Sequence, residues 1–260
     1  MTQPAPANPA PVTVRSRLVG LGLALAALAI GVVGGVVGGG WWEARRAAPV
    51  QRAAVERVVH DYILEHPEIL PQAVEKLRQT ETGAQLGSAR AALEQPFPGA
   101  VLGNPQGSVT LVEFTDYACT YCRRSVPDVT ALIAANPDLR VVIRELPILS
   151  PASGNAARMA LAAAEQGKYA AFHEAMFAGG RPDPQTIAAA AAAAGLDLAR
   201  AERIAAAPAT TAEIERNLAL ARQLGFQGTP SWVVGQAILS GAVGQTRLAE
   251  AVAATRADAG

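Results

Sequence analysis

VTLVEFTDYACTYC, residues 109–122, joins a short β-branched run to both cysteines of a 260-residue chain. The run VTLVEFT predicts a β-strand, and a helix is expected from about Cys119 to Ala135, before NPD breaks it. LRVVIREL, residues 139–146, predicts a second strand. These elements form a β-α-β unit, for which parallel strands and a right-handed crossover are expected.

The rest of the C-terminal part extends this unit. Residues 150–224 are expected to form a helical insertion, with a capping box from Thr210 to Glu213. PSWVVGQAILSG predicts two short strands joined at Gly235-Gln236, and residues 246–255 a closing helix. The predicted class is α/β, with the order β-α-β, helical insertion, β-β-α.

Composition narrows the class of function. Half of the residues are apolar, so a large core is expected rather than disorder. Lysine plus arginine equals aspartate plus glutamate at 22 each. This balance lacks the basic excess that nucleic-acid binding requires, so we expect no nucleic-acid partner.

Residues 18–40, LVGLGLALAALAIGVVGGVVGGG, contain no charged residue. As a helix they would measure roughly 34 Å, against a hydrocarbon core of about 30 Å. A cleaved signal peptide is the alternative, because Arg15 and Arg17 precede the run. The length of the run and Trp41-Trp42 at its end favour a transmembrane anchor. Arginines flank it on both sides, so charge does not set its orientation.

Two further segments surround the anchor. Residues 1–17 predict a flexible tail. Residues 41–98 predict a helical extension and linker: two short amphipathic helices, the second restarting after Pro67, and then a linker over residues 82–99 that contains QPFPG. Short amphipathic helices bury their apolar side against another surface, either the catalytic domain or a second copy of the chain.

The cysteines allow three interpretations. As a structural bridge, a Cys119–Cys122 ring is worth only about 2 kcal/mol in the loop-entropy model. As a zinc or copper site, the pair needs more ligands, and His60, His66 and His173 form no local ligand pattern with it. The third interpretation is a redox-active pair.

The redox interpretation has independent support. Cys119 falls at a predicted helix start, where free backbone N–H groups stabilise a thiolate. Cys122 is near enough to attack a mixed disulfide formed at Cys119. Glu113 lies on a strand that reads as buried on both faces, where an acid is costly unless it is paired or protonated. We expect Glu113 to exchange a proton with the Cys122 thiol.

VTLVEFTDYACTYC, followed by a helical insertion and GTPSWVV, resembles the DsbA family of thioredoxin-fold thiol-disulfide oxidoreductases over about residues 99–260. The resemblance implies that Cys119 is the exposed nucleophile and Cys122 the buried resolving thiol. It also implies that Thr229-Pro230 is a cis peptide that faces them and presents backbone to an extended client segment. No dissociable cofactor and no metal are expected.

Two positions depart from the strongly oxidising members of that family. The dipeptide between the cysteines is Thr120-Tyr121 rather than Pro-His, and Thr229 replaces the valine before the cis-proline. Both departures favour an isomerase or reductase over an oxidase. VVHDYILEHPEILPQAVEKLRQ resembles the N-terminal extension of suppressor-of-copper-sensitivity C proteins, some of which oligomerise through it. A homo-oligomer is therefore one expected partner.

Disulfide exchange on secreted clients belongs outside the cytosol. We therefore expect a single-pass inner-membrane protein with its N-terminus inside and its catalytic domain in the periplasm. Expected partners are cysteine-containing extracytoplasmic clients, a membrane oxidase or electron donor, and the lipid bilayer around residues 18–40. A copper- or zinc-binding module that uses the same two thiols is the alternative function.

Overall fold

The computed structural model describes residues 52–258 and divides the chain into two compact units, residues 1–74 and 75–260. In the first unit, residues 52–65 are helical. The expected tail and the expected anchor, residues 18–40, lie outside the described residues. Within residues 52–258, no helix has both the length and the apolar content to cross a bilayer.

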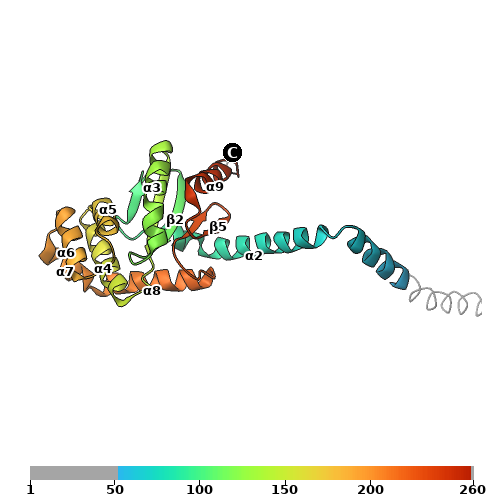
Figure 1. Ribbon diagram of the computed structural model, residues 1–260, viewed down its shortest axis with the longest axis horizontal. Helices are drawn as coiled ribbons and strands as arrows, with labels where there is room; N and C mark the ends of the chain where they lie inside the picture. Colours follow the sequence, from blue (N-terminus) through green and yellow to red (C-terminus); the bar gives the residue numbers. More distant parts are fainter. Residues whose placement is uncertain (1–51, 259–260) are drawn as a thin grey trace, which may run out of the picture. The chain divides into compact units, whose positions relative to one another are not determined.

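The second unit contains an α/β fold with the helical insertion that the sequence predicts (Figure 1). The elements are α2 (Ile69–Glu94), which begins in the first unit, β1 (Val101–Gly103), β2 (Val109–Thr115), α3 (Thr120–Ala135), β3 (Leu139–Glu145), α4 (Pro151–Glu165), α5 (Tyr169–Gly179), α6 (Pro184–Ala193), α7 (Leu198–Ala205), α8 (Pro208–Gln223), β4 (Ser231–Val234), β5 (Ala237–Ser240) and α9 (Gly244–Asp258).

The strands form one mixed sheet in the order β1-β3-β2-β4-β5. β2 and β3 are parallel, as predicted, and the register pairs Thr115 with Glu145. β4 and β5 form the predicted hairpin with Gly235-Gln236 as its turn, where Gly235 has a φ of 55° that suits glycine. β1 pairs with β3 and was not predicted.

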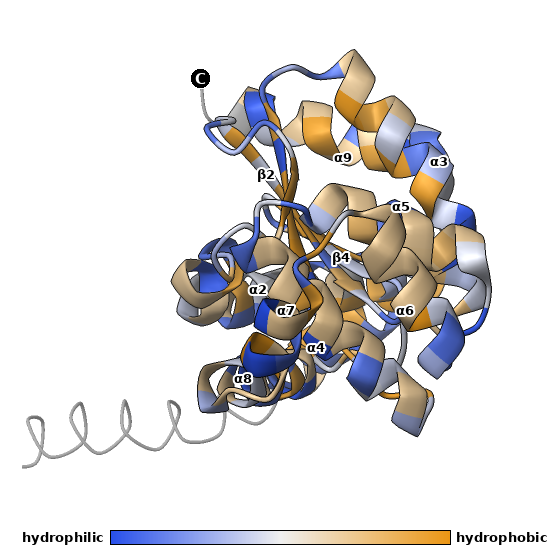
Figure 2. Ribbon diagram, turned by 90° about the vertical axis from the view of Figure 1, so that its left-hand side faces the viewer, coloured by the Kyte–Doolittle hydropathy of each residue, from blue (hydrophilic) through white to orange (hydrophobic). Residues whose placement is uncertain are grey.

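Helices cover both faces of the sheet, and apolar colouring is strong along β2 and also on parts of α3 and α9 (Figure 2). The alternation along β2 explains this arrangement. Leu111 packs in the larger core with α3, α9 and the insertion, whereas Val112 and Phe114 pack in a second core with α2 and α8. Glu113 belongs to the Leu111 side, so it points toward the layer that contains the cysteines.

Two expectations from the sequence are wrong. Residues 82–94 are helical rather than a linker, because α2 continues to Glu94 and buries Leu86, Ala89 and Leu93 in the second core. The capping box at Thr210 does not form: α8 begins at Pro208, and the Thr210 hydroxyl donates to the carbonyl of Ile204. A capping box exists instead at the N-terminus of α6, between Asp183 and Thr186.

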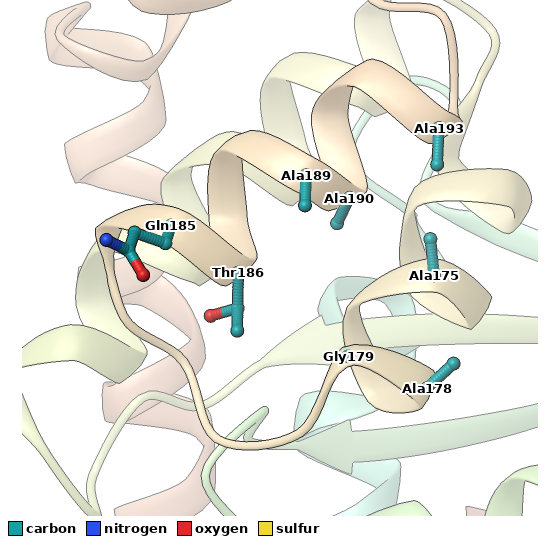
Figure 3. A pocket seen from close by; sticks show the side chains of 8 residues that line it. All are labelled: Ala175, Ala178, Gly179, Gln185, Thr186, Ala189, Ala190 and Ala193. Atoms are coloured by element: carbon teal, nitrogen blue, oxygen red, sulfur yellow. The ribbon is translucent and has the colours of Figure 1, made fainter.

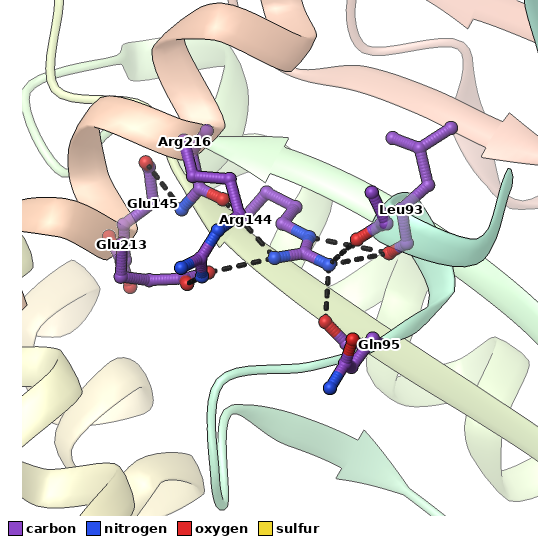
Figure 4. A network of polar contacts seen from close by, with 8 residues as sticks. Leu93, Gln95, Arg144, Glu145, Glu213 and Arg216 are labelled. Carbon is purple, nitrogen blue, oxygen red and sulfur yellow. Dashed lines mark hydrogen bonds and ion pairs between the residues drawn. The ribbon is translucent and has the colours of Figure 1, made fainter. Parts of the chain in front are cut away.

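Arg144 joins three elements on the α2 side of the sheet (Figure 4). Its guanidinium donates to Glu213 Oε1 at 2.7 Å and Asn217 Oδ1 at 3.3 Å, both on α8. It also donates to the carbonyl of Leu93 at 2.9 Å and to those of Ala92 and Gln95. These are carbonyls at the end of α2, where helices leave acceptors unpaired, so Arg144 caps this helix.

Candidate active site

Cys119 is the N-cap residue of α3, as the sequence predicts. Its amide donates to the carbonyl of Asp116 at 2.9 Å, which closes the turn between β2 and the helix. Its Sγ accepts from the Cys122 amide at 3.4 Å and donates to the Thr229 carbonyl at 3.1 Å. The carbonyl contact suits the neutral thiol, whereas the amide contact suits the thiolate.

The thiolate is the favoured form at neutral pH. The pKa of Cys119 is lowered from 9.0 to about 5, first by a hydrogen bond from the Cys122 thiol and then by the Thr229 side chain and the amides of Cys122 and Tyr121. Burial acts in the opposite direction. A thiolate at neutral pH is both a nucleophile and a good leaving group in disulfide exchange.

Cys122 has the opposite character. It is fully buried in the first turn of α3, and burial is the main cause that raises its pKa well above the ordinary value. The hydrogen bond that it gives to Cys119 and the charge of Glu113 raise it further. No disulfide joins the two cysteines in this structure. The pair therefore combines one ionised sulfur with one protonated sulfur, three residues apart.

Glu113 is buried, as predicted, with 3% of its surface exposed. Burial raises its pKa from 4.5 to about 8, and the negative charge of Cys119 adds to this shift. The Thr115 side chain lowers this pKa, by less than burial raises it but by more than the Cys119 charge does. An acid that titrates near neutral pH can both accept and return a proton under physiological conditions.

The remaining predicted residues surround the sulfurs. The Thr229-Pro230 peptide bond is cis, as the resemblance implied, and both residues are buried. Thr120 is exposed, and Tyr121 is 58% exposed. Cys119 itself is only 5% exposed, so the expectation that its side chain is exposed is wrong, because the carbonyl of Thr229 lies against its sulfur.

Several buried polar residues near the site were not singled out from the sequence. The Asp116 carboxylate accepts from the amides of Ala118, Ile148 and Leu149, at 2.8 to 2.9 Å, and so connects the cysteine turn to the loop after β3. Glu145, at the end of β3, accepts from two tyrosine hydroxyls. The one signal in the sequence that could have identified Glu145 is an acidic residue within a strand that is otherwise apolar and buried.

Neither a metal site nor a reactive groove between α5 and α6 is found in the described part of the chain. Over residues 52–258, no group of three or more histidine, cysteine, aspartate or glutamate side chains is arranged to hold a metal ion. A groove of about 470 Å³ lies between α5 and α6 (Figure 3). Alanine side chains such as Ala175 and Ala189 line it, with Gln185 and Thr186 at one end, so its lining offers no titratable group.

We expect the ionisation of Cys119 to make the relative stability of the two redox forms depend on pH. Cys119 has a pKa of about 5 in the folded protein, against 9.0 for an ordinary cysteine. Its ionisation therefore stabilises the folded reduced protein, fully above pH 9, and this stabilisation is lost as the pH falls to 5. The disulfide form has no such group. Thermal unfolding of both forms across this range measures the effect, and equal pH dependences would contradict it. Thiolate ultraviolet absorbance gives the midpoint directly.

Two protein-family models match separate parts of the chain. Residues 110–253 match the DSBA-like thioredoxin domain, and residues 51–82 match the N-terminal domain of the copper resistance protein ScsC. The second match confirms the resemblance noted for the extension.

Solved structures agree with these matches. A thioredoxin-like oxidoreductase from Silicibacter pomeroyi is 48% identical, with a TM-score of 0.59, and the alignment covers 60% of this chain and 91% of that one. The catalytic domain of Proteus mirabilis ScsC is 29% identical, with a TM-score of 0.61 and coverages of 67% and 98%. The thiol-disulfide exchange protein α-DsbA2 from Wolbachia pipientis is 26% identical, with a TM-score of 0.63 and coverages of 68% and 97%.

Curated relatives match only in part. The Na⁺/H⁺ antiporter NhaA 3 of Salinispora tropica is 33% identical over 102 residues, which are 36% of this chain and 16% of the antiporter. NhaA of Herminiimonas arsenicoxydans is 33% identical over 136 residues, 52% of this chain and 22% of the antiporter. The chain thus spans about a fifth of the length of these relatives.

The family match covers more than half of the chain, and it includes both cysteines and the cis-proline loop. The chain therefore belongs to the DSBA-like thioredoxin domain family and is a thiol-disulfide oxidoreductase.

Proposed function

We propose that this protein exchanges disulfides with extracytoplasmic protein clients, with Cys119 as nucleophile and Cys122 as resolving thiol, and that its net direction is isomerisation or reduction. The observation that carries the proposal is the contrast within the pair. The pKa of Cys119 is lowered to about 5 at a helix N-terminus, whereas that of buried Cys122 is raised. One sulfur is ready to attack and the other is held back until a mixed disulfide exists.

The proposed cycle has two exchanges. The Cys119 thiolate attacks a client disulfide, forms a mixed disulfide and releases the first client sulfur as a thiolate. Glu113 then takes the proton of Cys122, whose thiolate attacks Cys119 and releases the second client sulfur. The client disulfide gains two electrons, and the cysteine pair loses two. Exposed Thr120 and Tyr121 and the backbone at Thr229-Pro230 are the proposed contacts for an extended client segment.

The proposed net direction of disulfide exchange, isomerisation or reduction, is based on the residues Thr120-Tyr121 and Thr229. We expect a reduction potential of about −200 to −270 mV for the Cys119/Cys122 pair, which is the range of isomerases and reductases. Equilibration of the full-length protein with glutathione and dithiothreitol measures this potential directly, because the chain has no other cysteine. A value near about −120 mV would instead indicate a disulfide donor that a membrane oxidase recharges.

The proposed location is the inner membrane, with residues 18–40 as a single-pass anchor in the bilayer, a short tail inside, and a catalytic domain over residues 99–260 outside. A membrane electron donor would keep such a domain reduced. This part of the proposal is supported by the apolar sequence and by the extracytoplasmic role of the family. Alkaline extraction of membranes and protease treatment of intact spheroplasts test this proposal. Release of the protein from the membrane by alkaline extraction would contradict the proposed anchor.

We also propose that the helical extension, residues 41–98, mediates a homo-oligomer. In the helix over residues 52–65, Val55, Val58 and Tyr62 are 54% to 68% exposed, which is unusual for apolar side chains at helical spacing. Several linked sites would favour isomerisation by engaging one client repeatedly. Replacing Val58 and Tyr62 with aspartate should yield a monomer in sedimentation experiments. An unchanged mass would contradict this.

A further inference from the structure

Glu145 is a second buried carboxylic acid on the same face of the sheet as Glu113. Glu145 has no exposed surface. The parallel register places Glu145 opposite Thr115, and Glu113 is two residues before Thr115. Strands about 4.8 Å apart, with about 6.7 Å between alternate residues, separate the two glutamate Cα atoms by on the order of 8 Å. Two glutamate side chains can interact across this separation.

A cluster of neutral hydroxyl and imidazole groups surrounds the Glu145 carboxyl. Its Oε1 accepts from Tyr169 at 2.7 Å and from Tyr117 at 3.2 Å. The Nδ1 atom of His173 lies 3.1 Å from the Tyr117 hydroxyl oxygen and 3.4 Å from that of Tyr169. Since both hydroxyls donate to Glu145, the network assigns the His173 proton to Nδ1. Burial lowers the pKa of His173 to about 4, so its ring is neutral and does not compensate a charge on Glu145.

The second carboxyl oxygen of Glu145 lacks this support. Glu145 Oε2 and Thr115 Oγ1 are both buried without a hydrogen-bond partner, and they belong to paired residues of β2 and β3. A buried acceptor without a donor costs roughly 1–3 kcal/mol, and more when it is charged. No ion pair involves either Glu113 or Glu145 among the described residues. These conditions disfavour ionising both acids together.

Negative charges near Glu145 also favour its protonated form. Burial is the main cause that raises its pKa from 4.5 to about 8, and the charges of Asp116 and Glu113 add to it. The hydrogen bonds from Tyr169 and Tyr117 oppose this shift. Two carboxyl groups that interact in a buried site lose their protons in two steps that belong to the pair rather than to either residue.

We propose that Glu113 and Glu145 form a coupled carboxyl pair that holds at most one negative charge at neutral pH, in which Glu145 is a positioning residue that controls when Glu113 can accept the Cys122 proton. The inference deepens the proposed function and rests on it. The sequence predicts this proton transfer for Glu113 alone.

The pair acts at the resolving step. With Glu113 ionised and Glu145 protonated, the Cys122 thiol gives its proton to Glu113. The resulting thiolate forms a bond to the Cys119 sulfur, while the Cys119–client bond breaks and the client sulfur leaves as a thiolate with the electron pair. When Glu145 carries the charge instead, Glu113 keeps its proton and cannot accept another. In the reverse direction, protonated Glu113 returns the proton to the departing Cys122 thiolate.

Glu145→Gln tests the coupling, because the amide oxygen can still accept from both tyrosines but never ionises. The readout is the rate at which Cys122 releases a cysteine peptide from a preformed mixed disulfide with Cys119 in the full-length protein, followed from about pH 5 to pH 9. The unchanged protein should show a two-step rise. The variant should show one step with a midpoint lower by about half to one unit. It should therefore be about three- to tenfold faster at pH values between the two steps, where Glu145 of the unchanged protein is ionised and Glu113 is not.

Glu174→Gln is the matched control, because Glu174 is exposed on α5 beside His173, and its pH profile should equal that of the unchanged protein. Tyr169→Phe provides a second test if Glu145→Gln does not fold. Losing one donor keeps Glu145 protonated to higher pH, so the Glu113 midpoint should again fall, by less. An unchanged profile in the folded Glu145 variant, or in Tyr169→Phe when that variant alone folds, overturns the pair. Failure of the unchanged protein to release peptide would instead overturn the proposed function.

Discussion

Cys122→Ser is expected to stop turnover and to leave the protein covalently joined to its clients. The serine hydroxyl can still donate to Cys119 Sγ, which is the role of the Cys122 thiol that most lowers the pKa of Cys119. Capture of a client disulfide therefore continues, but no second thiolate can release the mixed disulfide. Insulin reduction measured in a steady-state assay should fall to the uncatalysed background, and non-reducing gels with mass spectrometry should show the trapped complex.

Two further variants make this prediction specific. Cys119→Ser should show neither turnover nor trapping. Its residual rate should equal that of a variant with both Cys119→Ser and Cys122→Ser, because the effects of substituting residues that act as a unit are not additive. Cys122→Ala removes the hydrogen bond as well as the thiol, so it should trap more slowly than Cys122→Ser and should raise the pKa of Cys119. Retained turnover in Cys122→Ser would mean that an external thiol resolves the intermediate. Metal binding that disappears in the same variant would favour the copper or zinc module.

Local sequence signals were sufficient for the central β-α-β unit. The β-branched run, the helix that follows it and the NPD break lie within 30 residues, and each element's signal depends on neighbours in the chain. The strand alternation also predicted that Glu113 is buried. Cys119 at the N-cap of α3 follows from the same signals, and it accounts for much of the chemistry at the site.

The errors concern segments whose structure depends on distant contacts. QPFPG, which follows Glu94, is a linker signal, yet α2 occupies residues 82–94 and continues through Gly83 and Gly87. Leu86, Ala89 and Leu93 have helical spacing, but this apolar side forms only because the sheet and α8 cover it. Tertiary burial thus outweighed the glycine penalty of roughly 1 kcal/mol per residue.

The cluster around Glu145 could not be predicted for a similar reason. Tyr117, Glu145, Tyr169 and His173 come from the turn before α3, the end of β3 and α5. Their sequence separations of up to 56 residues leave no local spacing pattern. Their meeting depends on the parallel register and on the packing of the insertion. A lone histidine in an apolar helix is more often a satisfied core residue than a functional group.

Replacing Arg144 with methionine is expected to destabilise the fold by roughly 3–5 kcal/mol, because it leaves a buried carboxylate without its partner. The Arg144 and Glu213 side chains are 1% and 3% exposed, and their nitrogen and oxygen atoms are 2.7 Å apart. The same substitution removes the donors to the Ala92, Leu93 and Gln95 carbonyls. For a domain of this size the melting temperature should fall by about 6–20 °C.

The measurement is thermal unfolding of the reduced full-length protein, with hydrogen exchange to locate the change. Exchange should accelerate most at the end of α2, since its carbonyl cap is lost. Arg216→Met is the matched control: Arg216 also contacts Glu213, but its side chain is 55% exposed, so its loss should change stability by less than about 1 kcal/mol.

A double variant separates the ion pair from the helix cap. Arg144→Met with Glu213→Leu removes the stranded carboxylate, so stability should recover in large part, while the end of α2 should still exchange quickly. If Arg144→Met alone melts within about 2 °C of the unchanged protein, Glu213 is satisfied by Arg216 and solvent, and the buried pair is not what holds α2 to β3 and α8. If instead the double variant is no more stable than Arg144→Met, the cap on α2 carries the stability and the charge pair contributes little.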